Sequence, residues 1–226
     1  MSKSFKIVAA VAAVLVIAAG AGLYWGQHKK AQLRGDIATL VADASARLRS
    51  ALGLEADQKS ADTADSVAQL EQDSAAFDRQ LAALHALDTS RDKALAEAAE
   101  DYLSTARQLT HYQARMHRMR IDVNGAVQAL DEHMRNADRR ARGWIGEAMR
   151  RKDDLEKKYF DYRMASDGFG DLARTYLDSR KQLAALLGAP AVVDEQLAID
   201  ARARAQQAAK ETAALVERAR QLAAPR

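Results

Sequence analysis

The chain has 226 residues and is rich in alanine, with two prolines, eleven glycines and no cysteine. The absence of cysteine excludes a disulfide scaffold, a cysteine-ligated zinc or iron–sulfur site and a cysteine nucleophile. Aromatic residues make up only 5% of the chain, and β-branched residues are sparse after the first 20 positions, which argues against a β-sandwich. Ala, Leu, Arg, Gln and Glu are abundant and favour helices, so we expect an all-α protein.

The net charge of +3 conceals an uneven distribution of charge along the chain. Residues 31–104 carry 7 basic and 14 acidic side chains, a net charge of −7, whereas residues 105–163 carry 14 basic and 9 acidic ones, a net charge of +5. Four further lysines flank the apolar run near the N-terminus, namely Lys3, Lys6, Lys29 and Lys30. The basic isoelectric point therefore gives no general support for nucleic-acid binding.

The first 27 residues have the composition of a membrane anchor. Ile7 to Trp25 is a run of 19 residues without a charge or a strongly polar side chain. As a helix it would be about 28 Å long, close to the ~30 Å hydrocarbon core of a bilayer. We expect residues 7–25 to contact the lipid bilayer, with the aromatic end in the headgroup layer. The assigned anchor positions are Ile7, Val11, Leu15 and Trp25.

The same segment also fits a cleaved signal peptide. Lys3 and Lys6 would then form its basic region, Ile7–Ala18 its apolar region and Ala19-Gly20-Ala21 a cleavage site. The length and aromatic end of the run favour the anchor, whereas its alanine content favours the signal peptide. In the anchor reading, the protein is a single-pass inner-membrane protein of a bacterial-type envelope, and residues 28–226 face the periplasm.

Residues 28–226 are expected to form an elongated α-helical domain, either an antiparallel bundle or a coiled-coil hairpin. The first helix after the membrane segment can continue directly from it, and the small polar stretch Asp57–Asp65 predicts a turn. Thr89 and Asp92 match a capping box before the third helix. The expected helices are Gln32–Leu52, Asp62–Leu87, Arg91–Met164, Asp171–Leu187 and Val192–Ala223.

The third helix carries the most regular pattern in the chain. Apolar residues recur there every seven positions, as in a coiled coil, at Leu95, Tyr102, Leu109, Met116, Val123, Leu130, Ala137 and Trp144. This pattern predicts an unbroken helix of about 110 Å to Met164, followed by a break at Ser166–Asp171. In the last helix, the expected buried positions are Leu197, Ala201, Ala208, Leu215 and Leu222.

No motif in the sequence indicates catalysis, a metal or a cofactor. The histidines lack metal-ligand spacing, and His133 is interpreted as a seam residue that sets the helix register. The carboxylates Asp92, Glu97, Glu100 and Asp101 lack the Glu-x-x-His pairs of a di-iron bundle and are interpreted as a solvated face. We therefore expect a protein that is not an enzyme and binds no cofactor.

A basic strip is the candidate partner site. It contains Arg139, Arg140, Arg142, Arg150, Arg151 and Lys152, with aromatic residues such as Trp144 nearby. Charge pairing within the chain or between subunits is the first interpretation. An anionic envelope partner or membrane surface is the second, and nucleic acid is the least favoured.

The features together favour an interaction protein of the envelope: a membrane-anchored scaffold, adaptor or sensor-like module that binds a protein partner or itself through its helical seams. The alternative is a soluble periplasmic helical protein with a binding or chaperone-like role, released by cleavage near Ala21.

Overall fold

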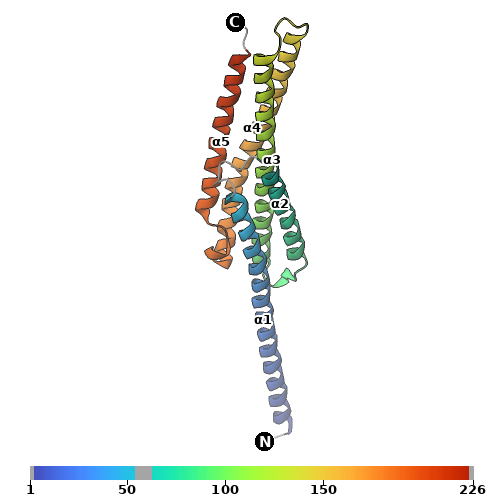
Figure 1. The fold of residues 1–226 in the computed structure, drawn as a ribbon. Coiled ribbons are helices and arrows are strands. Elements are labelled where there is room, and N and C mark those ends of the chain that lie inside the picture. The colour runs from blue at the N-terminus through green and yellow to red at the C-terminus, as the bar shows by residue number, and fades with distance from the viewer. Residues whose placement is uncertain (1–2, 54–62, 224–226) are drawn as a thin grey trace.

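The computed structural model describes the backbone of residues 3–53 and 63–223, and the side chains of residues 27–53 and 63–223. Over this part of the chain the protein consists of five α-helices and two 3₁₀ turns, without a strand. The expected all-helical bundle is confirmed. The molecule is elongated, and its helices run along the long axis (Figure 1).

The first two helices form an antiparallel pair at the lower half of the bundle (Figure 1). Helix α1 (Lys3–Gly53) enters the bundle without a turn, and α2 (Ala64–His85) returns beside it. The Thr63 hydroxyl accepts the Ser66 N–H at 3.1 Å and caps α2. From Leu33 onward α1 buries one side against the core, through Leu33, Ile37, Val41, Ala44 and Leu48.

The predicted membrane segment lies outside the residues whose side chains are described, and so do the anchor positions Ile7, Val11, Leu15 and Trp25. Among the described residues, no helix combines the length and apolarity needed to cross a bilayer. The expected turn at Asp57–Asp65 likewise falls mostly in the undescribed stretch 54–62.

Helices α3 (Lys93–Asn136) and α4 (Trp144–Leu187) form a long antiparallel hairpin. Each has 44 residues, which corresponds to about 66 Å. The α3 seam from Leu95 to Leu130 is buried at all six seven-residue positions, as the sequence predicts. On α4, the buried side comprises Leu155, Tyr162, Ala165, Phe169, Ala173, Tyr176 and Leu183.

Helix α5 (Glu195–Leu222) packs antiparallel to α4, after a short 3₁₀ turn at Ala189–Ala191. Near its start, Glu195 lies 3.6 Å from the Arg180 guanidinium of α4. Near its end, Arg220 binds both carboxylate oxygens of Glu156. This bidentate pair holds the end of α5 against α4 at Glu156, which lies twelve residues after the start of α4 at Trp144.

The prediction of one unbroken helix from Arg91 to Met164 is wrong, because the chain reverses at residues 137–143. Ala137 has an extended backbone, and Gly143 has φ +93°, which is strained for residues with a Cβ. The Asp138 carboxylate accepts the Arg140 N–H at 2.9 Å within this turn. The seven-residue pattern includes Trp144, but this residue already belongs to the returning helix.

The expected break at Ser166–Asp171 is also wrong, since α4 continues through this segment. Gly168 serves close packing there: a Cβ at this position would lie 2.6 Å from Cε1 of Tyr112 on α3. Phe169, its neighbour, is fully buried. The glycine thus lets two helices approach closely instead of ending one.

Two smaller expectations need correction. Thr89 and Asp92 do not form a capping box: Thr89 begins a 3₁₀ turn capped by the Asp88 carboxylate, and Asp92 makes no side-chain cap. The buried face of α5 is Ala198, Ala201, Ala205, Thr212, Val216 and Ala219. Of the expected set, only Ala201 is buried, and Leu222 is 51% exposed. Small alanines form most of the contact of α5 with the bundle, and they gave little hydropathy pattern in the sequence.

We predict that Gly168→Ala destabilises the protein by about 1–2 kcal/mol, because the clash with the Tyr112 ring outweighs the gain of about 1 kcal/mol in helix propensity. Gly170→Ala is the matched control, because no atom lies within 4 Å of a Cβ at that position. It should stabilise the protein by up to about 1 kcal/mol. Urea unfolding of both variants measures the difference, and equal effects would contradict the packing role of Gly168.

Candidate interaction surface

The basic strip lies at the end of the α3–α4 hairpin, far from where α1 enters the bundle (Figure 1). Arg139, Arg140 and Arg142 lie in the connecting turn, while Arg150, Arg151 and Lys152 lie in the second and third turns of α4. We call residues 135–152 the basic tip. It carries seven basic and two acidic side chains, a net charge of +5.

Aromatic stacking holds the turn of the basic tip in place. The His133 ring stacks on the Trp144 ring, with centroids 5.3 Å apart, and His133 Nε2 lies 3.1 Å from the Trp144 carbonyl oxygen. The Arg139 guanidinium lies over the same indole at 5.8 Å. His133 therefore packs between the end of α3 and the start of α4.

The basic side chains differ in their partners. Arg150 and Arg151 both pair with Glu147, and Arg151 also donates to the Ala129 carbonyl at 3.2 Å. Arg140 and Arg142 are exposed, and neither side chain has a partner among the described residues. The charge of the turn is therefore available to an external anion.

Among the described residues, the acidic first part of the chain forms no ion pair with the basic tip. It pairs instead with the middle of α3, where Arg107 binds Asp78 at 2.9 Å and Arg118 binds Glu71 at 2.6 Å. Both carboxylates belong to α2. In the strip itself, Arg150 and Arg151 pair within the chain, with Glu147 on the same helix.

An exposed apolar face begins inside the basic tip and continues along α4. Ile145, Met149, Phe160 and Met164 of α4 are 68%, 63%, 60% and 55% exposed, respectively. The residues of each pair are four positions apart, and Met149 and Phe160 are eleven positions apart, which is about three helical turns. All four side chains therefore lie on one side of the helix. We call these four residues the α4 stripe. The spacing of four residues was the sequence signal for a shared face, and the structure adds that this face is exposed.

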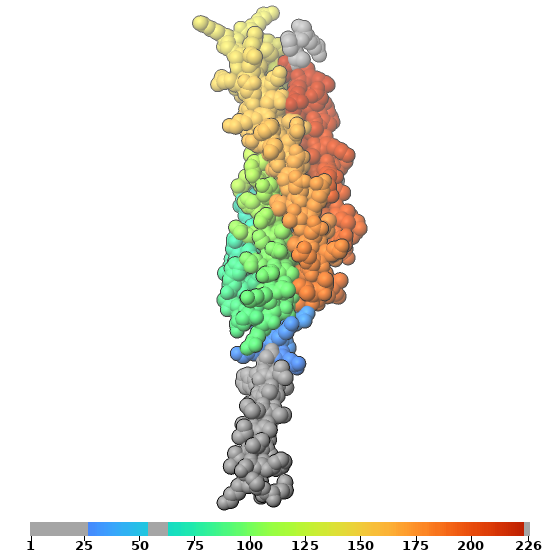
Figure 2. Space-filling model, turned by 180° about the vertical axis from the view of Figure 1, so that it is seen from behind, coloured from blue at the N-terminus to red at the C-terminus, as the bar shows by residue number. Residues whose placement is uncertain are grey.

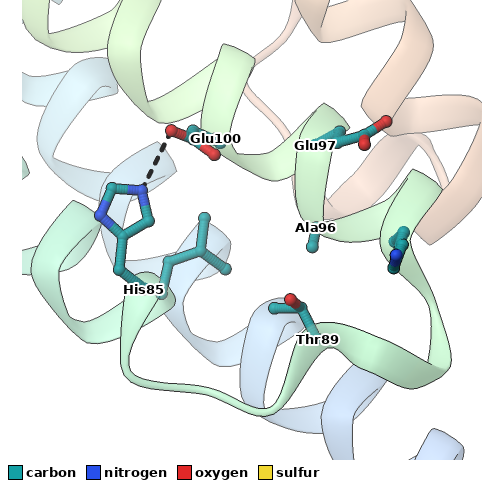
Figure 3. Close-up of a pocket in the computed structure, with 7 residues that line it drawn as sticks. His85, Thr89, Ala96, Glu97 and Glu100 are labelled. Atoms are coloured by element: carbon teal, nitrogen blue, oxygen red, sulfur yellow. Dashed lines mark hydrogen bonds and ion pairs between the residues drawn. The ribbon is translucent and has the colours of Figure 1, made fainter.

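A shallow pocket of about 260 Å³ lies at the opposite end of the bundle (Figure 3). His85 Nε2 lies 3.0 Å from Glu100 Oε1 at its edge, and Thr89, Lys93 and Glu97 also line it. Nearby, Lys30 of α1 lies 3.3 Å from Asp92. The carboxylates expected to form a solvated face are thus partly paired. In the described residues, no group of three acidic or histidine side chains is arranged to hold a metal.

Buried hydroxyl groups form a polar cluster inside the bundle. Ser45 donates to the Ala191 carbonyl at 2.9 Å, so the Tyr102 hydroxyl donates to Ser45 at 2.8 Å. The Tyr176 hydroxyl and the Val193 N–H donate to the Tyr102 oxygen at 3.4 and 3.5 Å. These bonds connect α1, α3, α4 and the segment before α5.

The chemistry of this cluster is structural. Burial, with a smaller effect of Tyr102, raises the pKa of the Tyr176 hydroxyl far above its usual value of 10. A hydroxyl with such a pKa stays protonated near neutral pH and is a poor base. The cluster joins four segments but lies against packed side chains, with both tyrosines fully buried.

Comparison with protein-family models, with curated proteins and with solved structures gave no significant match.

We predict that Tyr102→Phe destabilises the protein by about 2–3 kcal/mol, because it leaves the Tyr176 O–H and the Val193 N–H without an acceptor in the core. Tyr176→Phe is the matched control, since its hydroxyl makes only the 3.4 Å bond to Tyr102. It should cost about 1 kcal/mol or less. Thermal or urea unfolding gives both values, and equal losses would contradict the central role of Tyr102.

Proposed function

We propose that this chain is a single-pass, inner-membrane-anchored helical interaction protein of the bacterial envelope, acting as a scaffold, adaptor or sensor-like module. Residues 7–25 anchor it in the bilayer, and residues 28–226 project into the periplasm. The basic tip, including Arg139, Arg140 and Arg142, contacts an anionic partner. The proposal assigns no chemical step to the chain.

The position of the basic tip is the observation that carries this proposal. Asp92, which pairs with Lys30 of α1, immediately precedes α3. The turn with the free arginines follows the other end of the same helix, about 66 Å away. An anchor at residues 7–25 would therefore present the tip far from its own bilayer. Such a rod suits contact with a partner at a distance from the membrane surface.

The 19-residue apolar run supports the anchor on sequence grounds, through its length and its flanking lysines. The first described side chains of α1 after this run are exposed, and its buried face begins at Leu33. A helix that leaves one end of the bundle in this way suits a membrane connection. In the alternative, cleavage of the signal peptide releases the same bundle as a soluble periplasmic protein with a binding or chaperone-like role.

We predict that a C-terminal tag is accessible from the periplasm and that the full chain resists extraction by alkaline carbonate. Protease accessibility in spheroplasts, compared with intact and lysed cells, measures the sidedness. A tag protected in spheroplasts and cleaved only after lysis would contradict the periplasmic location. N-terminal sequencing tests the anchor separately: a mature protein that starts at Gly22 would establish the soluble alternative.

We predict that the triple variant Arg139→Gln, Arg140→Gln, Arg142→Gln elutes from immobilised heparin at a clearly lower salt concentration than the wild-type chain in a neutral detergent. Heparin is the polyanionic probe, and salt screens exposed charges. The control variant Lys157→Gln, Arg163→Gln, Lys181→Gln changes the net charge by the same amount away from the tip. Equal shifts of both variants would contradict a specific role for the tip.

A further inference from the structure

We infer that the α4 stripe is a self-association surface, through which two copies of this chain pack side by side with their basic tips at the same end. This inference rests on the proposed membrane anchor for the direction of the two copies. The stripe itself, the charges within it and the helices around it supply the other arguments.

The stripe lies on the side of α4 that points away from α3. On a helix with 3.6 residues per turn, Ile145, Met149, Phe160 and Met164 lie within about 100° of one another. The buried residues Leu155, Tyr162, Ala165 and Phe169 lie on the opposite side. Seven large apolar side chains are exposed in the described residues, and four of them form this stripe. Such clustering marks an interaction surface.

The neighbouring helices leave this side of α4 accessible. α4 extends along the whole length of one face of the molecule, with α5 on one side of it (Figure 2). The Arg220–Glu156 pair holds α5 beside α4, and Arg220 also lies 5.7 Å from the centre of the Tyr159 ring. By the helical count, Glu156 lies between Ile145 and Met149 around the axis, so α5 reaches the stripe on that side. Met149 and Phe160 nevertheless remain 63% and 60% exposed.

The charges in the middle of the stripe indicate what covers it. Lys152 and Asp153 separate its two apolar pairs, and both are exposed. Lys152 also helps to lower the pKa of Glu156, whose main partner is Arg220. They lie toward opposite edges of the stripe. Consider two parallel α4 helices related by a two-fold axis that runs along them. The edge of the stripe with Lys152 then faces the edge with Asp153 on the other copy, at the same height along the helix. Lys152 then lies opposite Asp153 of the partner subunit, and the symmetry creates this contact twice.

An anionic lipid surface fits the middle of the stripe less well than a second copy does. Residues 150–159 carry five basic and three acidic side chains, but Asp153 is exposed at one edge of the stripe, where anionic headgroups would repel it. A second copy instead places a lysine opposite Asp153, so that both exposed charges are paired.

Both orientations of two helices would bring apolar residues together, and the anchor selects the parallel one. Two chains whose α1 helices start in the same bilayer have their tips pointing the same way. Met149 then lies against Met149 of the partner subunit, and Phe160 against Phe160 of the partner subunit. The charged residues between the two apolar pairs lower the stability of this contact. Confinement to a membrane raises the local concentration and offsets this weakness.

Cysteine cross-linking tests the inference directly, because the chain has no native cysteine. Met149→Cys and Phe160→Cys are reconstituted separately as full chains in vesicles and oxidised with copper phenanthroline. Each variant should form disulfide-linked homodimers. Asp154→Cys is the matched control, since Asp154 is exposed on the same helix but lies away from the stripe. Equal cross-linking of the control would overturn the inference, because it would indicate random collision.

A mixture of Met149→Cys and Phe160→Cys in the same vesicles tests the direction. An efficient cross-link between the two variants, without the homodimers, would indicate an antiparallel pair and overturn the parallel arrangement. Absence of any cross-link would overturn the interface. Carbonate extraction of the same vesicles tests the anchor separately: homodimers formed by a chain that extracts would retain the interface and contradict the anchor.

Charge swapping gives a second readout that does not depend on cysteine placement alone. In the Phe160→Cys background, Lys152→Asp should reduce the rate of homodimer formation by about two- to fivefold, because two acidic residues then face each other. Adding Asp153→Lys should restore the rate, because the swapped pair is again complementary. A double variant as slow as the single one would contradict the Lys152–Asp153 contact.

Discussion

The apolar seam of α3 is the constraint on which the rest of the bundle depends. Its six residues from Leu95 to Leu130 are each at most 1% exposed. All four other α-helices contact α3. A seven-residue spacing on a straight helix drifts slowly around the axis, so successive turns of the seam face different neighbours. The helix can therefore serve as the centre of the molecule without being apolar all round.

The polar groups of the core add specificity to this packing. Tyr102 belongs to the seam, yet its hydroxyl binds groups from three other segments of the bundle. Apolar contacts alone tolerate sliding of one helix along another. A buried hydroxyl has a fixed set of partners, and losing them is costly, so Tyr102 sets the height of α1, α4 and the start of α5 relative to α3.

The sequence predicts the helical class and the α3 seam because the spacing of large apolar residues reflects burial directly. It does not predict the turn at residues 137–143. The seven-residue spacing of apolar residues continues to Trp144, although the chain reverses its direction before this residue. Asp138 and Gly143 were the local signals. Gly168 appears as a breaker in the sequence, since only the structure places the Tyr112 ring against it. The α5 face is missed because alanine contacts give little contrast in hydropathy.

For the candidate surface, the sequence identifies the basic residues but not their availability. Only the structure separates Arg151, which binds Glu147 and a carbonyl oxygen, from Arg140 and Arg142 in the turn. The sequence does not reveal the exposure of the α4 stripe for a different reason. Apolar residues at helical spacing normally indicate a core, and their exposure depends on where α5 and α3 lie.

The direct entry of α1 into the bundle has a mechanical consequence. Leu33 begins the buried face of α1, and the adjacent Arg34 donates to the Leu186 carbonyl of α4 at 2.5 Å. Lys30 is likewise attached to Asp92 before α3. With these attachments, the bundle follows α1 as a rigid arm. A tilt of about 5° at its base would move the end of α3 by about 6 Å, given a helix length of about 66 Å.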